Sequence, residues 1–111
     1  MKTDSKVVKK IQDKYHYLVN YGSSDPNEPI DPLTYVDSGG DSLLHIAAQL
    51  GDLETISSLI DAGMAINKAG DMGSTALHYA YDGKHQEVVD FLLTKGASTE
   101  LKNDFGKLPG E

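Results

Sequence analysis

Two histidines are the side chains of this 111-residue chain whose spacing could place them together for chemistry. His45 and His78 lie 33 positions apart in the similar strings Ser-Leu-Leu-His-Ile-Ala and Thr-Ala-Leu-His-Tyr-Ala. In neighbouring copies of one structural unit, their imidazoles would lie at similar depth, as in a metal pair. A zinc site, however, needs three or four ligands, and neither histidine has a carboxylate or a third ligand at zinc-site spacing. We therefore expect no metal site and no metal cofactor.

The carboxylates and hydroxyls form no catalytic pattern either. Asp52, Glu54 and Glu87 fall in the first turns of expected helices, where a negative charge favours the helix dipole. Ser57 has no histidine or lysine at triad-like separation. The loop 37–41 lacks the ligand order of an EF-hand and the ending of a P-loop. We therefore expect no catalytic residue, no cofactor and no enzyme.

The composition excludes further classes of function. The chain has no cysteine, no arginine and a net charge of −7, from ten lysines and seventeen acidic residues. A phosphate backbone is bound through cations, so a nucleic-acid partner is not expected. No apolar run approaches the roughly 18 residues of a membrane span, and the first residues lack the apolar stretch of a signal peptide. We therefore expect a cytoplasmic protein with no membrane partner.

The charge is unevenly distributed along the chain. Residues 1–20 carry five lysines and two acidic residues, whereas residues 21–111 carry five lysines and fifteen acidic residues. Such a field could attract a basic partner protein, and salt would weaken that attraction. The alternative is that the carboxylates only solvate helix faces and loop tips.

An internal repeat of 33 residues predicts the fold. At this offset Gly40 matches Gly73, Leu44-His45 matches Leu77-His78, and Gly63 matches Gly96. A fixed period of this length is typical of a solenoid built from one supersecondary unit. Within each unit, two apolar stripes at helical spacing are separated by a glycine, which predicts two helices and a turn.

The repeated strings resemble the ankyrin repeat family over residues 37–109. The segments that match its Thr-Pro-Leu-His-x-Ala-Ala opening are 42–48 and 74–80, its second-helix start 52–56 and 85–89, and its glycine-containing exit 61–67 and 94–98. The resemblance implies an all-α solenoid of helix-turn-helix units with short hairpin loops. It also implies that each histidine bonds to the loop backbone and to the Ser42 or Thr75 hydroxyl three residues earlier.

The expected organisation has four segments. Residues 1–36 form an N-terminal capping helix and a long loop, 37–69 and 70–102 form ankyrin repeats, and 103–111 begin a third, incomplete repeat. The capping helix is expected over residues 4–20, with Asp4 or Ser5 as its N-cap and glycine 22 as its stop. A membrane-surface helix is the alternative for this segment. Its apolar stripe consists of Val7, Val8, Ile11, Tyr15, Leu18 and Val19.

Three departures from the family pattern carry information. Tyr81 replaces the second alanine of an inner helix. Gly83 lies one position early, so Lys84 occupies the position usually given to glycine, at a cost of about 1–2 kcal/mol if that residue is left-handed. No helix pair follows the hairpin 103–111, so Val88, Phe91 and Leu92 are expected to have no third helix pair over them. Either the chain continues or another surface covers that end, and self-association there is one possibility.

The resemblance assigns partner binding to the hairpin tips and to the solvent side of the inner helices. Leu50, Met72, Tyr81 and Phe105 are the expected anchors, although Leu50 and Tyr81 could instead fill gaps between inner helices. We expect a non-enzymatic module that binds a protein with a basic patch, such as an immunity protein neutralising a toxin. The alternative is a structural adaptor or a fragment of a longer ankyrin array. The expected protein-binding residues are Ser38, Asp41, Gln49, Leu50, Asp71, Met72, Ser74, Tyr81, Asp82, Asp104 and Phe105.

Overall fold

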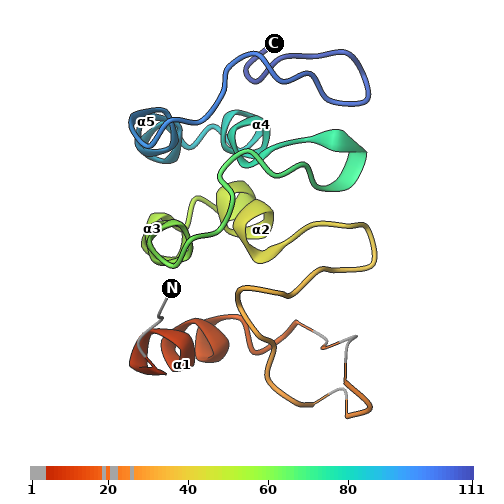
Figure 1. Ribbon diagram of the computed structural model, residues 1–111, viewed down its shortest axis with the longest axis vertical. Coiled ribbons are helices and arrows are strands. Elements are labelled where there is room, and N and C mark those ends of the chain that lie inside the picture. Colours follow the sequence, from red (N-terminus) through yellow and green to blue (C-terminus); the bar gives the residue numbers. More distant parts are fainter. Residues whose placement is uncertain (1–4, 19, 21–22, 26) are drawn as a thin grey trace.

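The computed structural model describes residues 5–18, 20, 23–25 and 27–111. In Figure 1, one column of helices faces a second column, and the hairpin loops project on the far side of the second column. Within the described ranges there is no strand, and the only bridge pairs Val36 with Ser42. The all-helical fold predicted from the 33-residue period is therefore confirmed. The elements are α1 (Ser5–Lys14), α2 (Leu43–Leu50), α3 (Leu53–Asp61), η1 (Asp71–Gly73), α4 (Ala76–Asp82) and α5 (Gln86–Thr94).

The core lies between the inner helices α2 and α4 and the outer helices α3 and α5. Apolar residues three and four positions apart face this interior, because such residues share one side of a helix. None of the helices in the described ranges is long and apolar enough to span a membrane. The fully buried apolar side chains of these helices include Leu43, Leu44, Ala47, Ala48, Ile56, Ala76, Ala80 and Leu92.

Three hairpins repeat one backbone geometry on the side opposite the outer helices. In each hairpin, an N–H donates to the carbonyl four residues later, which closes the loop. The pairs are Asp37 to Asp41 at 2.9 Å, Gly70 to Ser74 at 2.8 Å and Asn103 to Lys107 at 2.9 Å. The hairpin at 103–107 is therefore built like the two before it.

The N-terminal helix is shorter than the stripe predicted. It ends at Lys14, and the chain continues through a turn that buries Tyr15. Gln12 donates its side-chain N–H to the Ile30 carbonyl at 2.8 Å, which ties α1 to the loop that follows. Several residues of the expected stripe and stop lie outside the described residues. They are Asp4, Val19, Tyr21 and Gly22.

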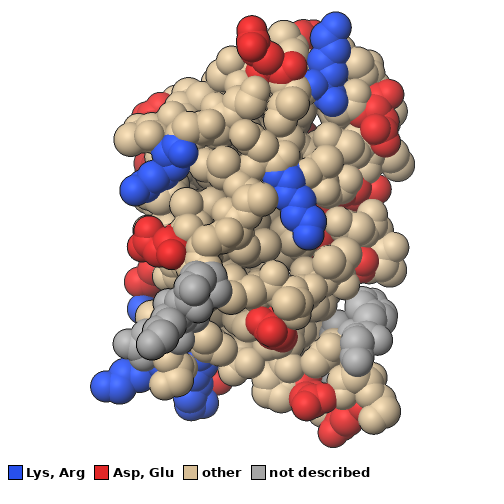
Figure 2. Space-filling view, in the orientation of Figure 1, with Lys and Arg blue, Asp and Glu red and all other residues tan. Residues whose placement is uncertain are grey.

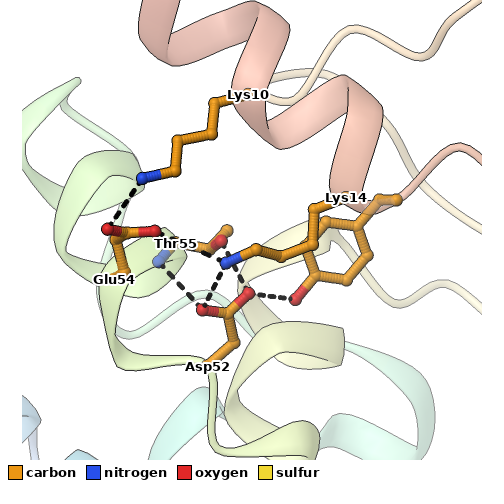
Figure 3. A network of polar contacts seen from close by, with 6 residues as sticks. Lys10, Lys14, Asp52, Glu54 and Thr55 are labelled. Atoms are coloured by element: carbon orange, nitrogen blue, oxygen red, sulfur yellow. Dashed lines mark hydrogen bonds and ion pairs between the residues drawn. The ribbon is translucent and has the colours of Figure 1, made fainter.

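A polar network holds α1 against the start of α3 (Figure 3). Asp52 is the N-cap of α3 and accepts hydrogen bonds from the Tyr15 hydroxyl at 2.7 Å and the Thr55 hydroxyl at 2.7 Å. Its other oxygen lies 3.2 Å from the Lys14 ammonium, and Lys10 pairs with Glu54 at 3.0 Å. Burial alone would raise the pKa of Asp52, but the bonds from Thr55, Tyr15 and Lys14 outweigh it and lower the pKa below its ordinary value.

We expect Asp52→Asn to lower the free energy of unfolding by about 1–2 kcal/mol at pH 7, because charge-assisted bonds become neutral ones. Because the folded pKa is depressed, the wild-type carboxylate stabilises the fold above its unfolded pKa of about 3.9 and loses that effect as pH falls through the folded pKa. Urea unfolding measured from pH 7 to pH 3 should therefore show a shallower acid decline in Asp52→Asn. Asp61→Asn, at the exposed end of α3, is the matched control. A parallel decline in wild type and Asp52→Asn would contradict the network.

Two expectations for the second full repeat had different outcomes. Lys84 is left-handed, with φ 59°, so the cost that sequence analysis attached to a left-handed residue at this position applies. Of the three side chains expected to lie uncovered, Val88 and Leu92 are instead fully buried, whereas Phe91 is half-buried. The pairing of α4 with α5 already encloses Val88 and Leu92.

Candidate protein-binding surface

His45 ties the start of α2 to the backbone that leads into the second hairpin. Its Nδ1 accepts the Ser42 N–H at 3.0 Å and lies 2.8 Å from the Ser42 hydroxyl. Its Nε2 lies 2.8 Å from the carbonyl oxygen of Lys68, just before the second hairpin begins at Gly70. A carbonyl can only accept, so Nε2 carries the proton and the imidazole is the Nε2–H tautomer.

His78 repeats this arrangement one unit later. Its Nδ1 accepts the Thr75 N–H at 3.0 Å, and its Nε2 lies 2.9 Å from the Lys107 carbonyl. The histidine bonding implied by the ankyrin resemblance is thus confirmed in both repeats. In the part of the chain that the structure describes, no three His, Asp or Glu side chains gather closely enough to hold a metal ion.

Asp41, which sequence analysis predicted as a binding residue, instead uses its carboxylate in hydrogen bonds within the protein. One of its carboxylate oxygens accepts the Asp71 N–H at 2.8 Å and the Tyr79 hydroxyl at 2.7 Å. Gly70, at the start of the second hairpin, leaves room for this carboxylate, since a Cβ there would lie 2.4 Å from it. Burial and the bond to Asp41 raise the pKa of the Tyr79 phenol. Asp41 therefore links neighbouring hairpins, a role that sequence analysis missed.

The other predicted residues differ in accessibility. Ser74 is 8% exposed, and its hydroxyl accepts a 3.5 Å contact from Asn103, so it offers little surface to a partner. Asp71 is half-buried. Tyr81 lies at the C-terminal end of the stack, against Gly110 rather than among the hairpin tips. The exposed members of the set are Ser38, Gln49, Leu50, Met72, Tyr81, Asp82, Asp104 and Phe105.

Two hairpin tips present adjacent apolar side chains. Met72 is 55% exposed and Phe105 is 68% exposed. The Asp104 N–H donates to the Met72 carbonyl at 2.9 Å, which fixes the tips beside each other. Met72 is also left-handed, with φ 57°, a conformation that costs a residue with a Cβ about 1–2 kcal/mol. The Met72 side chain nevertheless stays largely exposed at this strained position.

Carboxylates predominate along the hairpin side of the molecule. Figure 2 shows acidic side chains spaced along this edge. In the described parts of loop 23–36 and of the hairpins at 37–41, 68–74 and 102–107, the lysines are fewer than the acidic residues. The acidic residues are Asp25, Glu28, Asp31, Asp37, Asp41, Asp71 and Asp104, and the lysines are Lys68, Lys102 and Lys107.

The repeat geometry agrees with a comparison against known families. A model described as ankyrin repeats in three copies matches residues 7–103. The chain belongs to the ankyrin repeat family. The match begins inside α1, so the family pattern includes the N-terminal helix as well as the two full repeats.

Curated ankyrin relatives are longer than this chain. It is 39% identical over 77 residues to the probable 26S proteasome regulatory subunit p28 of Saccharomyces cerevisiae. The aligned region covers 68% of this chain and 34% of that protein. Over 67 residues, covering 60% of this chain, it is 36% identical to the human ankyrin repeat domain-containing protein 40, of which it spans 18%. Over 79 residues, covering 71% of this chain, it is 30% identical to the human protein phosphatase 1 regulatory subunit 27, of which it spans 51%.

Ankyrin repeats are non-enzymatic modules that generally mediate contacts between proteins. In this chain, the histidines, Asp41 and Ser74 hold the ankyrin hairpins in place. The hairpin tips at Met72 and Phe105 remain exposed. Their chemistry is apolar at Met72 and Phe105, with Asp104 beside them.

Proposed function

We propose that this ankyrin module binds a partner protein through its hairpin tips and the exposed end of α2, and that the contacted patch on the partner is basic. The observation that carries the proposal is the exposed pair Met72 and Phe105, held on hydrogen-bonded tips. Large apolar side chains form the centres of protein interfaces, and charged residues form their rims. The excess of carboxylates along the hairpin side supports a basic patch on the partner.

We expect Met72→Ala and Phe105→Ala each to weaken binding by about 1–2 kcal/mol, or roughly 5- to 30-fold in Kd, as central apolar contacts do. The partner would be captured from an extract of the source organism, identified by mass spectrometry and titrated by calorimetry against each variant. Both residues are highly exposed, so the melting temperature should stay unchanged.

Leu93→Ala is the matched control, because Leu93 is 38% exposed on α5, in the helix column away from the hairpins. A captured protein that binds both tip variants with wild-type affinity would overturn the proposed surface. A loss of melting temperature in either tip variant would assign that residue to the core. Binding that does not weaken as salt rises would contradict the basic patch.

Two narrower roles remain proposals. One is an immunity-type inhibitor that acts in the cytoplasm, which the acidity of the chain supports. The test of the inhibitor role is whether the gene lies beside a toxin gene. Co-expression of this chain with that toxin should then restore the growth of cells that the toxin inhibits. The longer relatives favour a second candidate, a structural adaptor formed by a segment of a longer array. Self-association through the C-terminal end has less support, because Val88 and Leu92 are already buried.

A further inference from the structure

The outward face of α4 and α5 differs from the face on which they themselves stack. A groove of about 210 Å³ lies between these two helices and is lined by Tyr81, Lys84, His85 and Gln86 over Ala80 and Val89. In the preceding repeat, the positions equivalent to Ala80, Tyr81 and Val89 are the fully buried Ala47, Ala48 and Ile56. The comparison of the two faces tests whether a further repeat could stack in the same way.

Stacking of α4 and α5 on α2 and α3 depends on Gly51. The His85 ring lies over this glycine and donates from Nε2 to the Gln49 carbonyl at 2.9 Å. A Cβ on Gly51 would lie 2.5 Å from Nδ1 of His85, closer than real Cβ contacts come. Gly51 also has φ 76°, so its left-handed backbone fixes the direction in which a Cβ would point.

Lys84 occupies the position equivalent to Gly51, 33 residues later, and has the same left-handed backbone. Its Cβ therefore occupies the space that a following repeat would need for the ring corresponding to His85. A repeat added in the observed geometry would meet this Cβ and the side chain beyond it.

Two other positions oppose stacking on the same face. Ala48 is fully buried between repeats, but its equivalent is Tyr81, whose ring packs within 3.2 Å of where a Cβ on Gly110 would be. The half-buried Leu53 is replaced by Gln86, which is exposed and donates to Asp90 at 2.8 Å. The face is therefore bulky where a neighbouring helix would have to approach and polar where it would have to be apolar.

We propose that the outward face of α4 and α5 is a terminal face of the ankyrin stack, on which no further helix pair packs in the geometry of the preceding repeats. A solenoid needs such an end, because each repeat contacts only its neighbours and an open apolar face would aggregate. The inference goes beyond the proposed function, since it bounds the stacked array and not the partner.

An extended chain tests this directly. Residues 1–107 would be followed by a second copy of residues 75–102, which supplies a helix pair at the natural 33-residue spacing. The same extension would be made with Tyr81→Ala, Lys84→Gly and Gln86→Leu, the residues found at positions 48, 51 and 53. Unextended chains with and without these substitutions are the controls, and circular dichroism, melting temperature and limited proteolysis are the readouts.

We expect the added segment on the wild-type face to stay protease-sensitive and to leave the melting temperature unchanged. On the substituted face, it should gain helix signal, resist protease and raise the melting temperature by about 5 °C or more over the unextended control. Equal stacking on both faces would overturn the proposal. Failure on both faces would also overturn it, because the three named residues would then not be what prevents stacking.

Discussion

Replacing His45 with alanine is expected to lower the free energy of unfolding by about 3 kcal/mol, from the lost buried hydrogen bonds and the cavity together. The imidazole is fully buried and satisfies the Ser42 N–H and the Lys68 carbonyl at once. Removing it leaves both groups without this partner and loosens the attachment of the next hairpin. Urea unfolding followed by circular dichroism would show a lower midpoint with an unchanged m value.

His16→Ala is the control for this change, because His16 is exposed in the turn after α1. It should leave the midpoint within error of wild type. A loss below about 1 kcal/mol for His45→Ala would mean that water replaces the ring at little cost. A stoichiometric zinc or iron signal in purified protein would contradict the hydrogen-bonding role more directly.

Gly51→Ala should be comparably damaging, at about 3 kcal/mol. The left-handed backbone of Gly51 accounts for about 1–2 kcal/mol of this when a Cβ is added, and overlap with His85, at 2.5 Å, accounts for the rest. Because His85 belongs to the second full repeat, the substitution should separate the two repeats as well as strain the turn. Thermal unfolding would show both a lower midpoint and a broader transition.

Gly96→Ala separates the two causes. Gly96 is also left-handed, with φ 95°, but a Cβ there would meet nothing within 4 Å. It should therefore show the backbone cost alone. If Gly51→Ala and Gly96→Ala destabilise the protein equally, the contact with His85 is not what requires glycine at position 51.

The sequence predicted the features that repeat and missed those that depend on one local contact. The 33-residue period indicated the helix pairs, and the ankyrin resemblance the bonding of His45 and His78, because each feature occurs twice. The displaced glycine pointed to Lys84 as a position to check, and the structure shows that its backbone is left-handed. These features follow from backbone geometry, and the spacing of apolar residues and glycines in the sequence reflects that geometry.

The site was less predictable, because exposure depends on neighbouring loops. Ser74 occupies a hairpin position that the ankyrin resemblance assigns to partner binding. In the structure, Asn103 of the next hairpin contacts its hydroxyl and the residue is buried. The link from Tyr79 to Asp41 joins residues 38 positions apart and has no counterpart in the other repeat. The burial of Val88 depends on how closely α4 and α5 approach each other, which the spacing of apolar residues does not specify.

The acceptors that His45 and His78 use have a consequence for how such a protein can change over evolutionary time. Both imidazoles reach main-chain oxygens, those of Lys68 and Lys107, and every amino acid supplies that atom. Mutations at the two lysine positions can thus accumulate without uncoupling adjacent units. When a repeat is duplicated, its histidine and the main-chain acceptor are copied together. New binding specificities can then be selected at the hairpin tips while the hydrogen bonds of the histidines are kept.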